Sequence, residues 1–583
     1  MRWNNLKKKL PFIARNNPGE QGIVIGNEAI ARGCFEAGVI IGAGYPGTPS
    51  TETLEALALI SVMNPITKDI KVEWSINEKV GFEVALGGSM SGARSFGCMK
   101  HVGVNVASDA FMTAAYAGAK GGLVLLSADD PSCHSSQNEQ DNRFYGLHAL
   151  VPVFEAISPQ DAKELVKYAF EFSEKFESLV LFRTTTRLNH ARGNITLGDV
   201  KVLDRKYQFD HDRARWTFLP TNARVYRVKL IERLKKIKDF ANEFPFNELN
   251  IKEGAKIGII SSGIPYAHTM DALTTLNLRS KISLLKLGMV YPLPEHLVLK
   301  LMDSCEKILI VEELEPILET LVKKIAFENG RRVEIHGKDI FPQNKEFPAE
   351  LVLHHIAEFC EVKSPYSEPD LKNILKAPPR PPVLCPGCSH RTTYYAMKLV
   401  EQEMNTHFIH SSDIGCYTLG FYPPVNAVDT CICMGGSIGM ANGITKLDSR
   451  PVLAILGDST FFHSGIPGLI NAVFNQNDII VVIMDNLSTC MTGFQDHPGT
   501  GVKITKKEGT QVVIEKLVEG CGVQQDSIFV IDSVDLPALV DAFRKAVSKS
   551  GVKVIIPRHK CSLLESNEKR KKNIKIDPYY VDI

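Results

Sequence analysis

The sequence predicts an α/β protein in which two large segments with parallel β-sheets flank a smaller α/β segment. Short apolar runs alternate with amphipathic stretches over residues 22–192, and the same alternation returns over residues 383–564. Such alternation is typical of βαβ units, whose strands are parallel. A shorter pattern of the same kind covers residues 256–334. We therefore expect two domains of similar size and class on either side of a smaller one.

Particular runs locate the expected elements. The stretch 223–244 has the spacing of an amphipathic helix, and the Pro-rich stretch 376–382 is typical of an extended linker. The predicted strands cover residues 38–41, 122–127, 179–182, 256–261, 282–287, 307–313, 331–337, 452–458, 479–486 and 552–557. The predicted segments are an arm (1–20), the first domain (21–200), a helical connector (201–253), the middle domain (254–345), a linker (346–382), the last domain (383–565) and a tail (566–583).

Composition bounds the class of protein. The chain has 583 residues, of which 44% are hydrophobic and 23% charged, with a net charge of +1. These values are ordinary for a globular protein, and the length suits three or four domains of roughly 150 residues. The balanced charge predicts no nucleic-acid surface. No apolar run approaches the roughly 20 residues that span a bilayer, and the basic N-terminus lacks an apolar signal core, so we expect a cytoplasmic protein.

Two motifs at strand ends predict a site for a diphosphate and a metal ion. Gly457, Asp458 and Ser459 follow one predicted strand, and Asn486 follows the next, at about the 30-residue interval of one βαβ crossover. Asp458 and Asn486 should therefore stand at the carboxyl edge of the sheet, where ligands bind. Their oxygens, with a backbone carbonyl such as that of Ser488, suit Mg²⁺. Gly-Asp-Ser is also compatible with a simple turn after a strand.

This pair resembles the thiamine-diphosphate motif, whose usual form is Gly-Asp-Gly followed by Asn-Asn. Here Ser459 replaces the second glycine and Asp485 the first asparagine. Thiamine enzymes also need a carboxylate beside the aminopyrimidine ring, contributed by another domain. Glu78, directly before an Ala/Gly-rich predicted helix, is the candidate, with Glu73 and Glu83 as rivals. Glu78 is equally compatible with a capping role, because the helix dipole favours a carboxylate there.

Several longer strings together resemble one family, the large (alpha) subunits of indolepyruvate:ferredoxin oxidoreductases, within the 2-oxoacid:ferredoxin oxidoreductases. The likeness covers about residues 20–565. The strings are YPGTPSTET (45–53), NEK (77–79), MKHVGVNVASD (99–109), SADDPSCHSSQNEQDNR (127–143), CPGCSHR (385–391), DIGCYTLG (413–420), CMGGSIGMANG (433–443), GDSTFFHSGIPGLINAV (457–473) and MTGFQDHPGTG (491–501).

The resemblance implies two domains of the thiamine-diphosphate-binding fold, a pyrimidine-binding one first and a diphosphate-binding one last, around a transketolase-C-terminal-like domain. It also implies oxidative decarboxylation of a 2-oxo acid, with aryl pyruvates such as indolepyruvate favoured, to acyl-coenzyme A and CO₂. The resemblance supports Glu78 as the activating carboxylate, and Thr48 matches the family's substrate-side threonine. Lys100 and His101 are candidates to hold the substrate carboxylate, although His101 is equally compatible with a hydrogen-bonded core residue. The expected cofactor-binding residues are Gly435, Gly436, Gly457, Asp458, Ser459, Thr460, Asn486, Ser488 and Thr489.

Four of the 13 cysteines match, in order and approximate spacing, the ligands of the 4Fe–4S cluster that related enzymes hold. They are Cys385, Cys388, Cys416 and Cys561. Four thiolates is the number that such a cluster requires. A single C-x-x-C can instead be a zinc or redox motif, and Cys431 and Cys433 are alternative ligands. The remaining cysteines are expected to be small buried hydrophobic residues: Cys34, Cys98, Cys133, Cys305, Cys360, Cys490 and Cys521.

The resemblance also implies partners. We expect a small beta subunit of the gamma-domain type, a ferredoxin-type electron acceptor, and a homodimeric core or a heterotetramer. Family members usually continue into a ferredoxin-like module, whereas this sequence ends at Ile583. We therefore expect either that a separate ferredoxin-type subunit docks on this chain or that the electrons leave by another route. Two other interpretations stay open: a non-oxidative thiamine-dependent decarboxylase or carboligase, and an inactive scaffold subunit.

Overall fold

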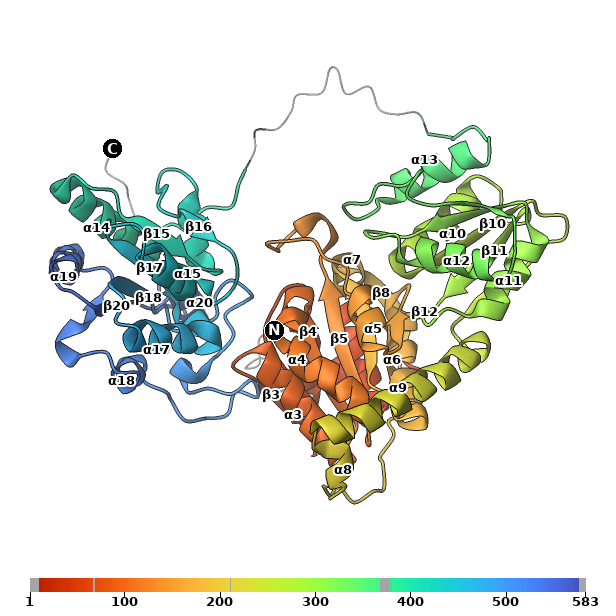
Figure 1. The fold of residues 1–583 in the computed structure, drawn as a ribbon, viewed down its shortest axis with the longest axis horizontal. Helices are drawn as coiled ribbons and strands as arrows, with labels where there is room; N and C mark the ends of the chain where they lie inside the picture. Colours follow the sequence, from red (N-terminus) through yellow and green to blue (C-terminus); the bar gives the residue numbers. More distant parts are fainter. Residues whose placement is uncertain are drawn as a thin grey trace. The chain divides into compact units, whose positions relative to one another are not determined.

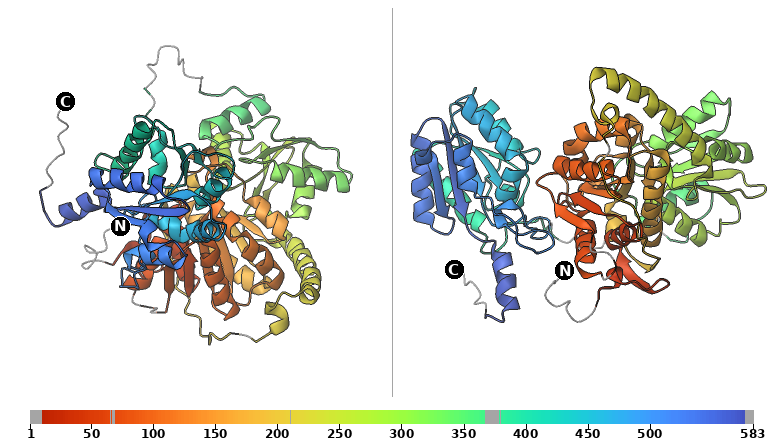
Figure 2. Two further views of the ribbon diagram at one scale, coloured as in Figure 1. Left: turned by 60° about the vertical axis from the view of Figure 1, so that its left-hand side comes forward. Right: turned by 90° about the horizontal axis from the view of Figure 1, so that it is seen from below.

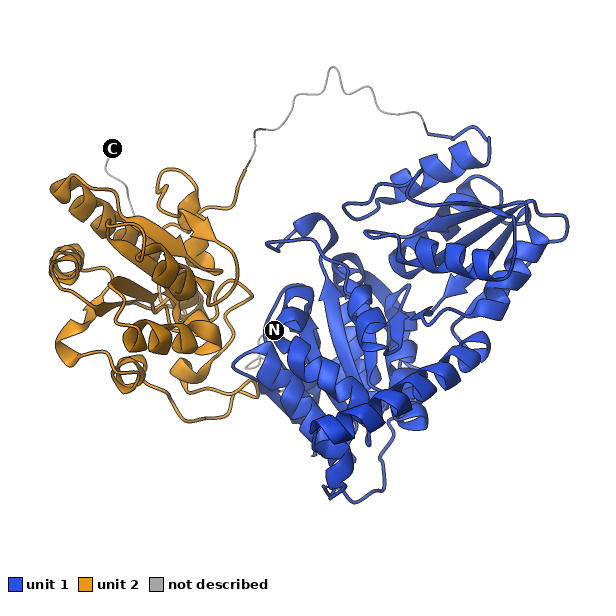
Figure 3. Ribbon diagram, viewed as in Figure 1, with its two compact units in different colours: residues 1–372 blue, residues 373–583 orange. Residues whose placement is uncertain are grey.

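The computed structural model describes residues 10–64, 66, 69–209, 211–366, 378 and 380–575 (Figures 1 and 2). The chain divides into two compact units, residues 1–372 and 373–583 (Figure 3). Residues 1–9 of the predicted arm and 576–583 of the predicted tail lie outside the described part. So does the Pro-rich stretch 376–382, apart from residues 378 and 380–382.

Unit 1 contains a seven-stranded sheet with the order β12-β6-β7-β5-β4-β2-β3. All neighbouring strands are parallel except β12, which is antiparallel to β6. The strands are β2 (Ile41–Gly44), β3 (Lys71–Trp74), β4 (Ser95–Lys100), β5 (Leu123–Asp129), β6 (Val153–Glu155), β7 (Val180–Thr185) and β12 (Met289–Tyr291). β4, β5 and β7 are buried at every position, as expected of parallel strands covered on both faces.

Two groups of helices accompany this sheet. In one group, α1 packs against α2 and α6. In the other group, α4 packs against α3 and α9, and these three helices lie in front of the sheet in Figure 1. The helices are α1 (Gly26–Glu36), α2 (Thr51–Met63), α3 (Glu78–Met90), α4 (His101–Ala117), α5 (Arg143–Ala149), α6 (Pro159–Phe176), α7 (Thr186–His190), α8 (Arg213–Trp216) and α9 (Pro220–Phe240). α9 confirms the helix predicted over 223–244. It begins earlier because proline suits the first turn of a helix. β1 (Gln21–Ile25) and β8 (Arg192–Thr196) form a separate antiparallel pair.

The middle segment forms a five-stranded sheet with the order β14-β13-β10-β11-β9. Its strands are β9 (Glu248–Asn250), β10 (Ile257–Ser262), β11 (Ile282–Leu287), β13 (Lys307–Val311) and β14 (Glu334–His336), and its helices are α10 (Gly263–Thr275), α11 (Glu295–Ser304), α12 (Ile317–Glu328) and α13 (Ala349–Phe359). α13 corrects the prediction of a linker from residue 346 onward. Its Val352, Leu353 and Ile356 pack into the apolar core beside α10, which gives the segment a reason to be helical.

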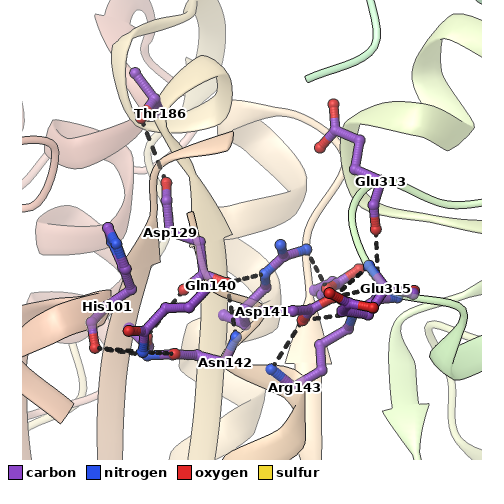
Figure 4. Close-up of polar contacts among 12 residues, drawn as sticks. His101, Asp129, Gln140, Asp141, Asn142, Arg143, Thr186, Glu313 and Glu315 are labelled. Atoms are coloured by element: carbon purple, nitrogen blue, oxygen red, sulfur yellow. Dashed lines mark hydrogen bonds and ion pairs between the residues drawn. The ribbon is translucent and has the colours of Figure 1, made fainter. Parts of the chain in front are cut away.

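The first and middle domains pack against each other within unit 1 and share a sheet and an apolar core. β12 comes from the middle segment of the sequence but extends the first sheet, and one apolar core includes Leu125 and Leu181 of the first sheet with Ile260 and Ile310 of the second. A buried ion-pair network lies beside this core. Arg143 donates to Glu312 at 2.7 Å and to the Glu313 carbonyl at 2.9 Å (Figure 4).

Unit 2 contains a six-stranded, all-parallel sheet with the order β16-β15-β17-β18-β20-β19. Its strands are β15 (Ile409–Ser412), β16 (Thr430–Cys431), β17 (Val452–Gly457), β18 (Ile479–Met484), β19 (Ile528–Asp532) and β20 (Val552–Arg558). Its helices are α14 (Ser389–Met404), α15 (Gly436–Ile444), α16 (Asp458–Thr460), α17 (Ile466–Phe474), α18 (Ile514–Gly520), α19 (Leu536–Ser548) and α20 (Ser562–Lys571). Figure 3 shows the sheet between its helices.

The predicted fold class is confirmed: two parallel-sheet α/β domains flank a smaller α/β domain in the sequence. Each predicted strand has a counterpart, although the one predicted at 38–41 is shifted to β2, because Gly38 has a φ of 71° and turns the chain. The finer domain boundaries remain predictions. No helix among the described residues is long and apolar enough to cross a bilayer.

Glu313 makes the stability of unit 1 depend on pH. One of its oxygens accepts from the Phe347 amide at 2.8 Å, and the other has no hydrogen-bond partner among the described residues. Burial raises the pKa of Glu313 from 4.5 to about 7. Because the folded-state pKa exceeds the unfolded value, stability is lost as the pH rises from about 4.5 through 7.

We predict that Glu313→Gln removes this loss. At about 1.4 kcal/mol per pKa unit, the variant should be more stable than wild type by roughly 3 kcal/mol at pH 8 and equal to it near pH 4.5. Thermal melting of both proteins across this pH range measures the difference, in which the titration of groups that do not interact with Glu313 cancels. A difference that does not change with pH would contradict the assignment.

Candidate active site

The first sheet gathers the predicted catalytic residues of unit 1 at one edge. Thr48 follows β2, Glu78 follows β3, and Lys100 and His101 lie where β4 passes into α4. Because β2 lies between β3 and β4 and all three are parallel, their carboxyl ends share one edge. The structure therefore brings the four residues to the part of the sheet where α/β proteins bind ligands.

Glu78 is a buried carboxylate at the first position of α3. Only 6% of its surface is exposed, and its Oε1 lies where a Cβ on Gly103 of α4 would approach to 2.8 Å. Glycine at 103 thus leaves room for the carboxylate. The cap of α3 is Asn77, whose side chain accepts from the Val80 amide at 3.0 Å. Glu78 therefore does not serve as the N-cap.

The two rival acids differ from Glu78. Glu73 lies exposed on β3 and accepts from the Ser75 hydroxyl at 3.2 Å, while Glu83 lies exposed on α3 and forms an ion pair with Lys79. Both are therefore solvated surface groups. Of the three acids, only Glu78 is buried at the sheet edge.

Lys100 and His101 are nearly inaccessible to solvent, with 8% and 0% of their surface exposed. Burial lowers the pKa of Lys100 to about 8, although the charge of Asp130 opposes the shift. Burial also lowers the pKa of His101. Its Nδ1 has no hydrogen-bond partner among the described residues. A buried ammonium beside a polar atom that lacks a partner is suited to an anionic ligand.

The loop of residues 130–142 packs over these side chains. Lys100 Nζ donates to the Ser135 carbonyl at 2.6 Å, His101 Nε2 lies 3.3 Å from the Asn138 carbonyl oxygen, and Ser135 Oγ donates to the Thr48 carbonyl at 3.4 Å. The end of the loop is fixed by Asn142, which donates to the His101 carbonyl at 2.9 Å (Figure 4). The loop thus contacts three of the four predicted catalytic residues.

The start of the loop is fixed by Asp130. Its Oδ2 accepts from the Ser135 amide at 2.8 Å and from the Ser136 hydroxyl at 2.5 Å, and its Oδ1 accepts from Thr186 Oγ1 at 2.6 Å. These hydrogen bonds hold the pKa of Asp130 below its usual value although burial opposes them. Asp130 carries no sign of this role in the sequence beyond its place in the string 127–143.

In unit 2, a second sheet edge gathers the predicted metal and cofactor residues. Cys416 follows β15, Asp458 follows β17, Asn486 follows β18, and Cys561 follows β20. These four parallel strands are consecutive neighbours in the sheet, so their carboxyl ends form one continuous edge. The structure brings the predicted ligands of the metal and of the cluster to adjoining positions.

Asp458 and Asn486 are both buried at this edge. Asp458 accepts from the Ser459 amide at 2.8 Å and the Ser488 amide at 3.3 Å, and His497 Nε2 lies 3.0 Å from its Oδ2. Burial would raise the pKa of Asp458, but the charge of His497 outweighs it and lowers that pKa. Asn486 Oδ1 has no hydrogen-bond partner among the described residues.

Asp485, which replaces the usual asparagine of the motif, faces Arg558. Arg558 Nε donates to Asp485 Oδ2 at 2.6 Å. Burial, and then the charge of Asp458, raise the pKa of Asp485 to about 6. Asp485 therefore pairs with Arg558, and its presence in the motif leaves Asp458 and Asn486 at the sheet edge.

The other predicted cofactor residues surround these two. Thr489 Oγ1 donates to Ser459 Oγ at 2.8 Å, Ser488 Oγ donates to the Gln495 carbonyl at 3.3 Å, and Thr460 Oγ1 donates to the Ile414 carbonyl at 3.2 Å. Gly457 ends β17 and is the N-cap of α16. The loops after β17 and β18 are thereby linked to each other.

Gly435 and Gly436 begin α15, close to a residue that sequence reasoning missed. Gly435 has a φ of 81°, and a Cβ on it would lie 2.3 Å from that of Ser464. Its amide donates to Asp413 Oδ1 at 2.8 Å, and the Ser437 amide donates to Asp413 Oδ2 at 3.1 Å. Asp413 therefore fixes the glycine turn. The sequence signal that could have identified Asp413 is its position directly after a strand.

The four predicted cluster cysteines lie close enough to interact electrostatically. Burial raises the pKa of Cys416 to about 12, and the thiols of its three partners in the set add to the shift. Burial also raises the pKa of Cys388 to about 11, with contributions from Cys385 and Cys561. By contrast, the shift of Cys433 involves only burial and Asp413. The mutual influence of these thiols on their pKa values is consistent with their lying near one another.

The prediction that all seven remaining cysteines are buried is wrong for five of them. Cys34 and Cys98 are buried as predicted, but Cys133 is exposed because it lies in the 130–142 loop. Cys490 is half-buried and forms a hydrogen bond with Cys561, which lowers the pKa of Cys561 below its usual value. A fifth thiol thus adjoins the predicted set. Cys305, Cys360 and Cys521 are also only partly buried.

Within the described residues, no three His, Cys, Asp or Glu side chains are arranged to hold a metal ion. Mg²⁺ in phosphate-binding sites usually takes only one or two carboxylates with substrate phosphates and water. Asp458 and the oxygen of Asn486 that lacks a partner are compatible with that pattern.

Comparison with known proteins finds a family match in each of the two units. Residues 413–556 match the family model "Thiamine pyrophosphate enzyme, C-terminal TPP binding domain", and residues 247–360 match "Indolepyruvate oxidoreductase domain". A solved 2-oxoglutarate:ferredoxin oxidoreductase from Magnetococcus marinus aligns with a TM-score of 0.46 and 17% identity over 58% of this chain and 65% of that one. The strand ends that carry Asp458 and Asn486 lie within the first of these matches.

Relatives that match nearly the whole chain show the family to which the chain belongs. The chain is 40% identical to indolepyruvate oxidoreductase subunit IorA of Thermococcus kodakarensis, over 99% of this chain and 91% of the relative. It is 42% identical to the subunit of the same name from Archaeoglobus fulgidus, over 98% and 91%. The chain therefore belongs to the indolepyruvate oxidoreductase subunit IorA family and is an oxidoreductase. The predicted family is confirmed.

We predict that Asp130→Ala loosens the 130–142 loop without unfolding the sheet. The change removes hydrogen bonds to a charged group, each worth about 1.5–3 kcal/mol. Amide hydrogen exchange of peptides covering residues 131–140 should accelerate by at least about tenfold, while β5 keeps its protection. The matched control is Asp109→Ala, at an exposed position on α4. Unchanged exchange in the loop of Asp130→Ala would contradict this role.

Proposed function

We propose that the chain catalyses the thiamine diphosphate-dependent oxidative decarboxylation of a 2-oxo acid, with aryl pyruvates such as indolepyruvate favoured. The products would be CO₂ and an acyl-coenzyme A, and the electrons would pass through a 4Fe–4S cluster to ferredoxin or a similar carrier. Bound thiamine diphosphate supplies an electron sink for the carbon that loses CO₂. The observation that carries the proposal is the pairing of Asp458 with the Asn486 oxygen that lacks a partner, at the edge of the domain that matches the thiamine pyrophosphate model.

The diphosphate would be held through Mg²⁺. Asp458, Asn486 and the Ser488 carbonyl are the proposed ligands in the protein. A buried amide oxygen without a donor is costly unless a ligand satisfies it, and a hard cation does so. The glycines at 435, 436 and 457, together with Ser459, Thr460 and Thr489, would surround the same cofactor.

Glu78 is the proposed activating acid. Its carboxylate would hydrogen-bond the aminopyrimidine ring of the cofactor and hold a proton there. Burial suits this task, because a carboxylate removed from water interacts more strongly with a single partner. Lys100 and His101 would bind the substrate carboxylate, and Thr48 would face the substrate from the end of β2.

Cys385, Cys388, Cys416 and Cys561 are the proposed cluster ligands. Each cysteine of a four-iron cube binds a different iron, so the four sulfurs do not converge on one point as the ligands of a single ion do. A cluster is therefore compatible with the finding that no three His, Cys, Asp or Glu side chains in the described part of the chain could hold a single ion. Four thiolates satisfy the cube.

A smaller partner subunit is also proposed, because the similar proteins are themselves named as subunits. The assembly would be a homodimeric core or a heterotetramer. Coenzyme A would be the acyl acceptor.

Iron analysis tests the oxidative part of this proposal. Protein purified without oxygen should contain about four irons per chain and be brown. Cys416→Ser should lose most of this iron and colour, whereas Cys521→Ser, at a partly buried cysteine outside the set, should keep both. Wild-type protein without iron that still releases CO₂ would favour a non-oxidative thiamine decarboxylase instead.

Glu78→Gln tests the catalytic part. We expect CO₂ release from indolepyruvate to fall by about 10²- to 10⁴-fold, the range typical of a lost acid–base group, while the cofactor still binds. Glu83→Gln, five positions along the same helix and exposed, is the matched control and should remain active. If wild type and Glu78→Gln turn over alike, Glu78 is not the activating acid. If neither turns over, an inactive scaffold becomes the better interpretation.

A further inference from the structure

The amide of Asn486 can bind a cation through only one of its two ends. Its Oδ1 is an acceptor and its Nδ2 a donor, so a half-turn of the side chain would present the wrong atom. Asn486 is 7% exposed, and its Oδ1 has no partner among the described residues. Its Nδ2 does have one: it lies 3.3 Å from Nε2 of His390.

His390 is itself held firmly in place. It is the second residue of α14 and is 3% exposed. Its ring packs edge-on against Tyr417 at 6.1 Å between centroids. The Tyr417 hydroxyl is in turn fixed by the Ile414 carbonyl at 2.9 Å and by Thr460 Oγ1 at 3.0 Å. The imidazole therefore has little freedom to follow a rotation of the amide.

We infer that His390 is a positioning residue for the metal: its Nε2 accepts a hydrogen bond from Asn486 Nδ2 and thereby holds Oδ1 toward the cation. This inference rests on the proposed function, because the cation is the one that would carry the diphosphate. It assigns the histidine no contact with the metal or the cofactor. It also fixes the tautomer, since an accepting Nε2 requires the proton on Nδ1.

The arrangement follows a general pattern of metal sites. Partners that orient a ligand are commonly as necessary as the ligand itself, and their loss typically costs 10- to 100-fold in metal affinity. Here the partner comes from the start of α14, whose N-cap is Cys388. The segment Cys385–His390 would thus serve the cluster through its thiols and the magnesium site through its histidine.

Three variants separate orientation from simple packing. His390→Phe keeps a ring of similar size but has no acceptor, whereas His390→Gln has a carbonyl oxygen that can accept from Asn486. His410→Phe is the matched control: His410 is 4% exposed in the same sheet, and its Nε2 lies 3.2 Å from Glu401 Oε1 rather than near the site. The melting temperature of each metal-free variant monitors the fold.

Binding of Mn²⁺, measured by electron paramagnetic resonance of the free ion in the presence of thiamine diphosphate, is the readout and needs no turnover. We expect His390→Phe to raise the dissociation constant for Mn²⁺ by at least tenfold. His390→Gln should stay within about threefold of wild type, and His410→Phe should not change it. If His390→Phe melts below His410→Phe, His390→Leu, which also lacks an acceptor, replaces it.

A double-mutant cycle provides an independent test of the proposed hydrogen bond between His390 and Asn486. In an Asn486→Asp background the ligand has two equivalent oxygens, so there is no orientation to fix, and the penalty of His390→Phe should disappear. Wild-type Mn²⁺ affinity in His390→Phe would overturn the inference, and so would equal losses in His390→Phe and His390→Gln. Wild-type protein that binds no Mn²⁺ with thiamine diphosphate would instead overturn the proposed function and this inference with it.

Discussion

The carboxyl ends of parallel strands meet at one edge of a sheet, and this constraint determines where most of the candidate residues lie. In unit 1 the edge formed by β3, β2 and β4 carries Glu78, Thr48 and Lys100. In unit 2 the ends of four neighbouring strands bring Cys416, Asp458, Asn486 and Cys561 together. Residues distant in the sequence become neighbours because each crossover between parallel strands returns the chain to the same edge.

The cost of burying charge shapes the surroundings of these edges. Arg143 is 1% exposed and is satisfied by carboxylates and carbonyls of both domains of unit 1, which keeps the strand ends and the 130–142 loop in register. Such networks stabilise a fold only while all of their members are paired. Lys100 and Glu313 are two groups for which burial outweighs the nearby opposite charge, so that burial lowers the pKa of Lys100 to about 8 and raises the pKa of Glu313 to about 7.

Polar groups without partners are the clearest structural sign of a ligand in this protein. Most buried polar atoms in proteins are hydrogen-bonded. His101 Nδ1 and Asn486 Oδ1 lack partners among the described residues, and each lies at the carboxyl edge of its sheet. Hydrogen bonds to His497 and to two backbone amides hold Asp458 in place, and packing against Tyr417 holds His390. A rigid frame around a free acceptor is what a preorganised binding site requires.

The sequence by itself determined the fold class and those strands that consist of strong apolar runs, such as β10, β17, β18 and β20. It also determined which residues stand at the ends of these strands. Both results follow from local signals, namely the periodicity of apolar residues and the motifs at strand ends. The sequence did not determine α13, whose helix depends on packing against α10, or the exposure of Cys133, which depends on a loop. Asp413, Asp130 and His390 also required the tertiary structure. Their roles consist of hydrogen bonds to distant segments, and no local pattern encodes which partner a buried polar side chain will meet.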